Sequence, residues 1–214
     1  LICAPGWSSD AAVAAVMAAK APSINGIFRG KAVVDIDSSK NGASNYSRVL
    51  AVKNGGGFTS EDMIVCWPMV KSGDYLFDLS VIVCGMIAKV DSGNADCPYE
   101  SPSNKDLTIT GTVNAEGEEI NITPPQADML SITDGVVTVL NNNGWVLWGN
   151  YLACFPKISD VAKVFICTNR TQDWLCNTFV NTYRQYIDKP LNPPLRDAII
   201  NSFNIWLSGL TAEG

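Results

Sequence analysis

The sequence predicts an α/β fold, in which a layered sheet is flanked by helices and is followed by a mainly helical segment. Three observations support this prediction. Apolar strands and helices alternate through residues 1–90, which is the order expected of a parallel sheet with crossover helices. A hairpin rich in Asn and Gly follows at 136–148. After Asn150 the apolar period becomes that of long helices.

The first six elements are predicted from apolar runs that turn residues separate. The expected order is strand 1–4, helix 9–20, strand 31–36, helix 43–53, strand 63–70 and helix 75–90. The run 32–36 is almost continuously apolar, as in strands that are covered on both faces. The glycines at 55–57 predict the end of the second helix. Pro68 predicts that its strand bends or lies at a sheet edge.

Polar side chains mark the starts of two of these helices. Ser8, Ser9 or Asp10 is expected to cap the first helix, and Asp74 the third. The third helix is apolar on all sides, which predicts that it is buried or lies against another subunit. Short strands with an acidic turn at 116–119 are expected over 107–122. A helix over 124–133 is expected to begin at its prolines.

The hairpin joins the predicted sheet to the helical segment. Its β-branched run 136–140 leads into Asn-Asn-Asn-Gly, residues that accept the positive φ of a tight turn. Trp145 and Trp148 lie in the second strand of the hairpin. Because one position is odd and the other even, their side chains face opposite sides of a regular strand. We therefore expect one tryptophan to pack in the core and the other under the helices.

Two long helical stretches are predicted after the hairpin. The first, over 158–187, is expected to be interrupted near 167–171. The second is expected to start with Asn192 as its cap and Pro193 in its first turn, and to end at Ser208–Gly209 or shortly after. One of its faces is apolar and should pack on 174–187; its residues are Leu195, Ile199, Phe203, Trp206, Leu207 and Leu210. Two domains are therefore predicted, an α/β domain over 1–153 and a mainly helical one over 154–214.

Composition argues against binding to nucleic acid or insertion into a membrane. The formal net charge is −6 and the basic residues are scattered singly, whereas phosphate binding requires clustered Lys and Arg. Arg170, Arg184, Lys189 and Arg196 do lie among aromatic residues, but in an acidic protein they are better explained as a solvated or protein-contacting face. The longest apolar run, 76–88, contains Asp78 and is too short to span a bilayer.

The residues that most often carry catalysis or hold metals are missing from the sequence. There is no histidine, which removes Ser–His–Asp and Cys–His arrangements and histidine metal sites. The seven cysteines lack zinc-ligand spacing and are expected to be reduced core residues. The pairs Asp35 with Asp37 and Asp74 with Asp78 could serve acid–base chemistry, but they are better explained as turn and cap residues. No catalytic, cofactor-binding or metal-binding residue is predicted.

The first strand–helix turn provides one alternative, a small α/β nucleotide-binding domain or enzyme. Phosphate-binding loops occupy such turns, and Asp35 would then be the ribose-binding acid. However, only Gly6 stands where a dinucleotide fingerprint needs three glycines, and the bulky Trp7 follows it. A tight turn with Trp7 packed as an anchor is the favoured interpretation.

Several blocks, in their order along the chain, resemble the sheath proteins of contractile phage tails. The opening "LICAPGWSSDAAVAAVMAAK" resembles a strand, a Pro-Gly turn and an Ala-rich helix of that family. The similar blocks that follow are "KAVVDIDSS", "MIVCWPMVK", "VCGMIAKVDSGNADCPYESPSNKDL", "VVTVLNNNGWVLWGN" and "PPLRDAIINSFNIWLSGL". The resemblance covers nearly the whole chain, and the shared order makes it more specific than any single block.

The resemblance implies a structural subunit and no enzyme. Its fold would be a subtilisin-like α/β domain without the active site, followed by the start of the C-terminal sheath domain. Such subunits form six-fold stacked rings around a tail tube, with baseplate and tail terminator proteins as further partners, and contraction drives the tube through a cell envelope. They would assemble in the bacterial cytoplasm and belong to the virion. Strands from terminal arms complete the sheets of neighbouring subunits in this family.

The sequence departs from the family at both ends, where the N-terminal arm and the distal C-terminal segment are missing. We therefore expect a core fragment that is monomeric or associates weakly. The resemblance places the helix 192–210 nearest the tube, with Arg196 and Asp197 as exposed contact candidates. A phage tail, an R-type bacteriocin and a prophage remnant all fit these residues.

Overall fold

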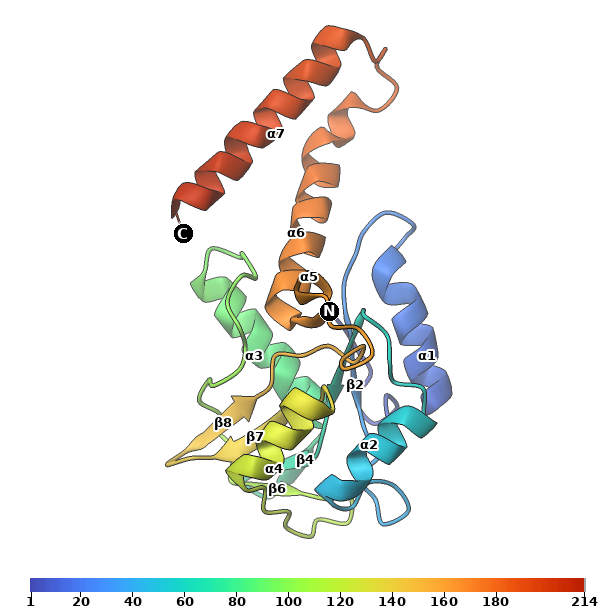
Figure 1. Ribbon diagram of the computed structural model, residues 1–214, viewed down its shortest axis with the longest axis vertical. Helices are drawn as coiled ribbons and strands as arrows, with labels where there is room; N and C mark the ends of the chain where they lie inside the picture. Colours follow the sequence, from blue (N-terminus) through green and yellow to red (C-terminus); the bar gives the residue numbers. More distant parts are fainter. Residues whose placement is uncertain (214) are drawn as a thin grey trace.

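A parallel three-stranded sheet forms the centre of the protein, described for residues 1–213 by a computed structural model (Figure 1). Its strands are β1 (Ile2–Cys3), β2 (Ala32–Asp35) and β3 (Met63–Cys66), in the order β1-β2-β3. Beyond β3, Val137 continues the sheet, since its N–H donates to the carbonyl of Val65 at 2.8 Å and its own carbonyl accepts from the N–H of Trp67 at 3.0 Å. The three predicted strands are thus confirmed, each shorter than expected.

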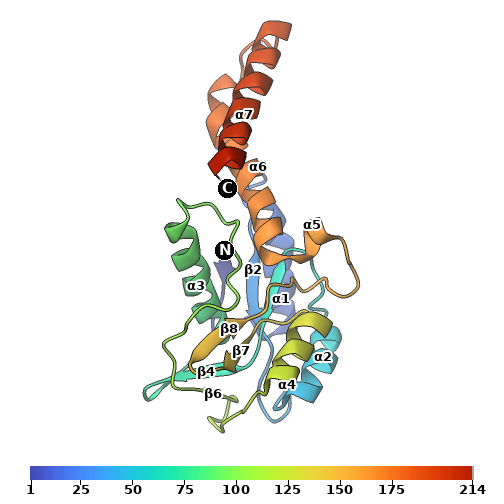
Figure 2. The same cartoon turned by 60° about the vertical axis from the view of Figure 1, so that its left-hand side comes forward.

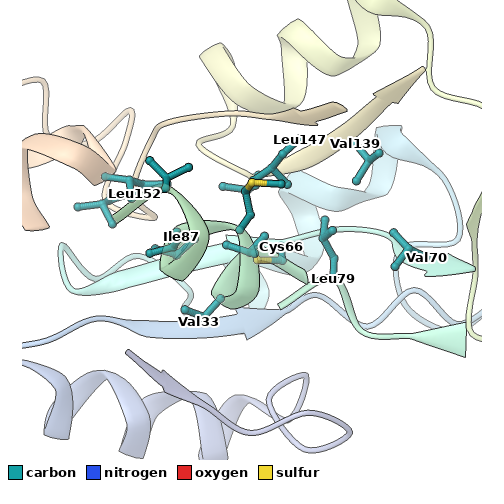
Figure 3. Packing of buried hydrophobic residues seen from close by; sticks show 14 of the residues in the cluster. Val33, Cys66, Val70, Leu79, Ile87, Val139, Leu147 and Leu152 are labelled. Atoms are coloured by element: carbon teal, nitrogen blue, oxygen red, sulfur yellow. The ribbon is translucent and has the colours of Figure 1, made fainter. Parts of the chain in front are cut away.

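Helices cover both faces of this sheet. Helices α1 (Ala11–Lys20) and α2 (Tyr46–Gly55) pack on one face together with Ala32, Val34 and Val65. Helix α3 (Leu79–Gly93) packs on the other face against Val33, Ile64 and Cys66. Figure 3 shows Leu79 and Ile87 of this helix beside Val33 and Cys66. Successive residues of a strand point to opposite faces, so a strand covered twice must be apolar throughout. The predicted layered α/β fold is confirmed in these terms.

The prediction of a helix from Tyr75 is wrong. Tyr75–Phe77 forms a strand, β5, and helix α3 begins only at Leu79. A second sheet contains β4 (Met69–Ser72), β5 and β6 (Gly111–Val113) in the antiparallel order β5-β4-β6. Gly73, at φ +60°, permits the tight turn that pairs Ser72 with Tyr75. The strand predicted over 63–70 bends at Pro68 and divides into β3 and β4.

The predicted hairpin is present as β7 (Thr138–Asn141) and β8 (Trp145–Trp148). Asn143 and Gly144 adopt positive φ in its turn. Trp145 packs against the core cluster under α3, whereas Trp148 packs beside α4 (Pro124–Asp128) and donates its Nε1–H to the carboxylate of Asp128 at 3.0 Å. The two tryptophans therefore face opposite sides, as predicted. The helix predicted over 124–133 continues from α4 as a π-helical turn, Met129–Thr133.

The helical segment projects from this body as two antiparallel helices (Figures 1 and 2). Helix α5 (Val161–Val164) is separated from α6 (Ile166–Tyr183) at Phe165, earlier in the chain than the predicted break at 167–171. Helix α7 (Pro193–Glu213) ends at Glu213, where the prediction was Ser208–Gly209 or shortly after. The side chain of Asn192 accepts from the N–H of Leu195 at 2.9 Å, which confirms the predicted cap. We call α6 and α7 together the helical arm.

The helical arm is rooted in the body through the first turn of α6. Ile166 is fully buried and belongs to the same apolar cluster as Leu152 and Cys154. Val164, at the end of α5, is also part of this cluster. The base of the arm thus shares its apolar core with the sheet and α3. The boundary at 153–154 between two domains stays a prediction.

Candidate functional site

Internal hydrogen bonds close the carboxyl edge of the parallel sheet. The alternative function, nucleotide binding, would place its site at this edge. Asp35 is buried there, and its carboxylate accepts from the Ser8 hydroxyl at 2.7 Å and from the Ser80 N–H at 2.9 Å. Ser80 lies in the first turn of α3, whose unpaired N–H groups favour a negative charge. Burial nevertheless raises the pKa of Asp35 to about 6. Asp35 therefore joins β2 to the start of α3 instead of facing a ligand.

The strand–helix turn at 4–8 is bound into the same network. The N–H of Gly6, which a phosphate-binding loop would offer to its ligand, donates to the carboxylate of Asp78. Trp7 is 72% exposed, so the prediction that it packs as an anchor is wrong. The helix that follows is capped by Asp10, whose carboxylate accepts from the N–H of Ala12 at 2.7 Å.

The members of the two carboxylate pairs have separate structural roles. Asp37 accepts from both the N–H and the hydroxyl of Ser39 at 2.9 Å, the turn role predicted for it. Asp74 lies in the turn between β4 and β5, so the prediction that it caps a helix one turn before Asp78 is wrong. Asp78 occupies the N-cap position of α3 instead. Among residues 1–213, no group of three or more potential ligands could hold a metal ion.

A buried lysine clamp fixes α6 to the body. Lys31, just before β2, is 1% exposed, and its Nζ lies 2.6 Å from a carboxylate oxygen of Asp62 and 2.6 Å from one of Asp173. Asp62 precedes β3 and Asp173 belongs to α6, so one ammonium ties three segments together. Burial raises the pKa of Asp173, against the lowering effect of Lys31. A buried ion pair of this kind is costly to break because removal of one partner leaves the other charge unpaired.

Further polar contacts surround α6 beside the clamp. The Asn177 side chain donates to the Arg29 carbonyl at 2.8 Å and accepts from the Arg29 N–H at 2.9 Å. Arg170 binds both carboxylate oxygens of Asp91 at the end of α3. We call the contacts of Lys31, Asp62, Asp173, Asn177, Arg29, Arg170 and Asp91 the arm joint. No sequence pattern predicted this joint, whose local signal is the spacing of Arg170, Asp173 and Asn177 along one helix face.

A second buried lysine secures the entry to the hairpin. Lys53, near the end of α2, directs its Nζ to the carbonyls of Asp134, Gly135 and Phe155. Burial lowers the pKa of Lys53 to about 8. A side chain at Gly135 would meet the Phe155 carbonyl at 2.9 Å, so the segment packs too closely for any other residue. The ammonium of Lys53 thus fixes the base of the hairpin by donating to three backbone carbonyls.

Aromatic rings hold the two helices of the arm together. The rings of Trp174 and Trp206 pack at a tilt of 37° with centroids 5.4 Å apart, and Phe179 meets Phe203 edge-to-face at 5.0 Å. The predicted packing of the apolar face of α7 on 174–187 is therefore confirmed. Arg196 and Asp197 are exposed, as predicted, and their side chains form an ion pair at 2.8 Å. Arg170, grouped in the sequence with exposed basic residues, lies in the arm joint instead.

An apolar groove of about 820 Å³ runs between the end of α7, α6 and the loop after α3. Tyr99, Trp174 and Leu210 contribute to its walls.

Most of the cysteines are at least half-buried, and Cys66 and Cys154 are core residues as predicted, but Cys176 on α6 is exposed. Within residues 1–213, no helix is both long and apolar enough to cross a membrane.

Comparison with known proteins identifies the fold. No family model matches the chain, and no curated protein sequence matches it. Among solved structures, the helical sheath of the anti-feeding prophage in its contracted state matches with a TM-score of 0.67 and 18% identity, over 94% of this chain and 51% of that one. The contracted sheath complex of the extracellular contractile injection system PVC matches with a TM-score of 0.66 and 17% identity, over 86% and 49%.

A sheath tail protein from Desulfitobacterium hafniense matches with a TM-score of 0.62 and 15% identity, over 96% of this chain and 44% of that one. The three matches agree in extent, because each covers most of this chain and about half of the other. Both the body and part of the helical arm must therefore be included in the matched region. This chain has the fold of contractile sheath proteins and spans about half the length of the solved sheath chains that it matches.

Proposed function

We propose that this chain forms part of a structural subunit of a contractile sheath. The observation that carries the proposal is the match to the anti-feeding prophage sheath across 94% of the chain, with a TM-score of 0.67. The closed carboxyl edge of the sheet supports a role without catalysis, because the polar groups there bond within the protein. The Gly6 N–H donates to the Asp78 carboxylate, and the Asp35 carboxylate accepts from the Ser80 N–H. A fold alone does not carry a function, so the proposal needs an assembly test.

In this proposal, copies of the complete protein assemble as six-fold rings stacked around a tube. A trigger at the baseplate makes the sheath contract, and each subunit moves as a rigid body while its contacts to neighbours change. The tube protein, the baseplate and a terminator protein are the expected partners. The particle is assembled in the bacterial cytoplasm as a phage tail, a bacteriocin or a prophage-derived system. The body would correspond to a subtilisin-like domain over 1–153 and the arm to the beginning of the C-terminal sheath domain over 154–214.

The surface of α7 that faces away from α6 is our candidate for the tube contact. Arg196 and Asp197 are exposed there, and Ile200 and Ile205 are exposed apolar residues on the same helix. The opposite face of α7 is occupied by the aromatic contacts with α6. The outward face is therefore the part of this helix that is free to meet a second protein.

The proposal is tested by co-expressing the protein that carries this chain with the tube protein encoded beside it. Electron microscopy should then show a sheathed tube whose cross-section has six-fold symmetry. Pulldown on the tagged tube should recover this chain in the sheathed particles. Bare tubes in the presence of soluble, monomeric protein would contradict the proposal.

The alternative function, a small nucleotide-binding domain or enzyme, predicts a different result. Ligand at a hundred times its dissociation constant stabilises a folded protein by about 2.7 kcal/mol, which shifts its melting temperature measurably. We expect no shift with nucleotides, because the turn at Gly6 and the carboxylate of Asp35 are already bonded internally. A reproducible increase with one nucleotide would favour the alternative.

A further inference from the structure

Three of the seven cysteines gather where α3 packs on the parallel sheet. Cys3 lies on β1, Cys66 on β3 and Cys84 on α3. Cys66 is fully buried in the apolar cluster, while Cys3 and Cys84 are only partly buried. Cys3 and Cys84 are therefore nearer to solvent than Cys66, which the surrounding side chains cover completely.

Cys3 and Cys84 are neighbours across the contact between β1 and α3. The thiol of Cys3 donates to the Ser80 hydroxyl over 3.5 Å, and Ser80 precedes Cys84 by one helical turn on the same face of α3. Cα atoms of β1 and α3 approach within 8 Å. Disulfides commonly join Cα atoms separated by about 4.4–6.8 Å, so they form between segments packed as closely as β1 and α3. Burial, and after it the neighbouring Cys3, raises the pKa of the Cys84 thiol to about 12.

We propose that Cys3 and Cys84 are an oxidisable dithiol, which forms an intramolecular disulfide in a glutathione-disulfide environment and fastens β1 to α3. The strand β1 contains only Ile2 and Cys3 and pairs with one neighbour, β2, so it lies at an edge of the sheet. A covalent link to α3 closes the loop between residues 3 and 84. Such closure restricts the unfolded chain and stabilises the folded one.

The reaction is ordinary thiol–disulfide exchange. The Cys3 thiolate attacks glutathione disulfide, forms a mixed disulfide and releases one glutathione thiolate. The Cys84 thiolate then attacks Sγ of Cys3, the bond to glutathione breaks, and the second glutathione thiolate leaves. The two cysteines lose two electrons, glutathione disulfide gains them, and the two thiol protons pass through water to glutathione. The half-buried position of Cys84 makes the second step the slow one, because only its thiolate attacks.

The test begins with the protein carrying Cys176→Ser, which removes the exposed thiol that would otherwise link two molecules. After incubation with glutathione disulfide, peptide mapping by mass spectrometry should show Cys3 joined to Cys84 with the loss of two hydrogens. The melting temperature should rise and return to its starting value after reduction with dithiothreitol. A map without this linkage, or with Cys3 joined to another cysteine, overturns the proposal.

The order of the two steps provides an independent readout. In the Cys84→Ser variant the reaction should stop at a glutathione adduct on Cys3, whereas Cys97→Ser should leave disulfide formation unchanged. Ring closure of the isolated Cys3 adduct should become about tenfold faster per pH unit near neutrality, as the thiolate fraction of Cys84 grows. An adduct that persists unchanged into alkaline solution contradicts the assigned partner even where the protein is fully folded.

Discussion

Asp35, a buried carboxyl group at the end of β2, makes the stability of the folded protein depend on pH. Burial raises its pKa to about 6 from 3.8, although it accepts hydrogen bonds from Ser8 and Ser80. The folded protein therefore holds a proton that the unfolded chain has already released between these pH values. The stability that this proton contributes is fully present below the lower pKa and is lost as pH rises through the higher one.

Replacement of Asp35 by Asn should remove this pH dependence. Asn keeps an acceptor for the Ser80 N–H and carries no charge. Relative to Asp35→Asn, the free energy of unfolding of the wild type should fall by up to about 3 kcal/mol between about pH 4 and about pH 7. Urea unfolding at several pH values measures this difference. Asp74→Asn, in an exposed turn, controls for the change in net charge, and parallel curves for wild type and Asp35→Asn would contradict the assignment.

At the scale of elements, α6 owes its position to the arm joint. Asn177 makes two hydrogen bonds with the backbone of Arg29 beside the Lys31 clamp. These bonds join a helix to a segment that is distant in the sequence, so their loss should loosen the joint without touching the apolar core. They offer a mild way to weaken the joint, because no charge is left unpaired.

Asn177→Ala should cost about 1 kcal/mol of stability, since the bonds are near the surface. Hydrogen exchange should become faster at the Arg29 amide and in the middle of α6. Asn181→Ala changes an exposed residue of the same helix and is the matched control. Equal exchange rates in the two variants would show that the Arg29 bonds do not hold α6.

Helix α7 depends on its aromatic contacts with α6. Trp206→Ala removes the ring that packs at a tilt against Trp174, and aromatic pairs contribute about 0.5–1.5 kcal/mol beyond simple burial. Amide exchange in α7 should accelerate several-fold while α1, α2 and α3 keep their protection. Near-ultraviolet circular dichroism should lose intensity in parallel. Ile205→Ala, at a residue that is 74% exposed, should leave both signals unchanged.

Local patterns predicted most elements, and the errors have identifiable physical causes. Tyr75–Phe77 is apolar and precedes an apolar helix, so its periodicity merges with that of α3, whereas pairing with β4 decides its structure. Trp7 was expected to be buried because tryptophan is large and apolar, but its strand–helix turn faces solvent. The arm joint was missed because Lys31 and Asp173 meet only after the chain has folded.

At the scale of the whole molecule, an acidic body carries an arm whose exposed charges are few and mixed. The proposed tube contact on α7 includes Arg196 and Asp197, which now pair with each other. Exchanging the two residues, with Arg196→Asp and Asp197→Arg, keeps net charge and helix composition but reverses the local charge order. We expect weaker co-sedimentation with assembled tubes, because charge order at an interface governs partner choice.

The double exchange should leave the isolated protein folded, since an exposed ion pair contributes about 0–1 kcal/mol. An unchanged affinity for tubes would count against α7 as the tube contact.

The relation of the body and the arm to sheath proteins could be inferred from ordered sequence blocks. The surfaces that meet partners could not be inferred in this way, because contact residues carry no periodic pattern of their own.

The arm joint makes the helical arm a lever. Helix α6 has 18 residues, which corresponds to about 27 Å of length from its base. A rotation of about 10° at the base would displace the far end of α6 by about 5 Å, roughly the rise of one helical turn. A torque applied at α7 is therefore resisted near Lys31. Its ammonium pairs with Asp62, which precedes β3, and with Asp173 on α6. The stiffness of the arm joint as a whole thus limits how accurately a protein bound at the arm is positioned relative to the body.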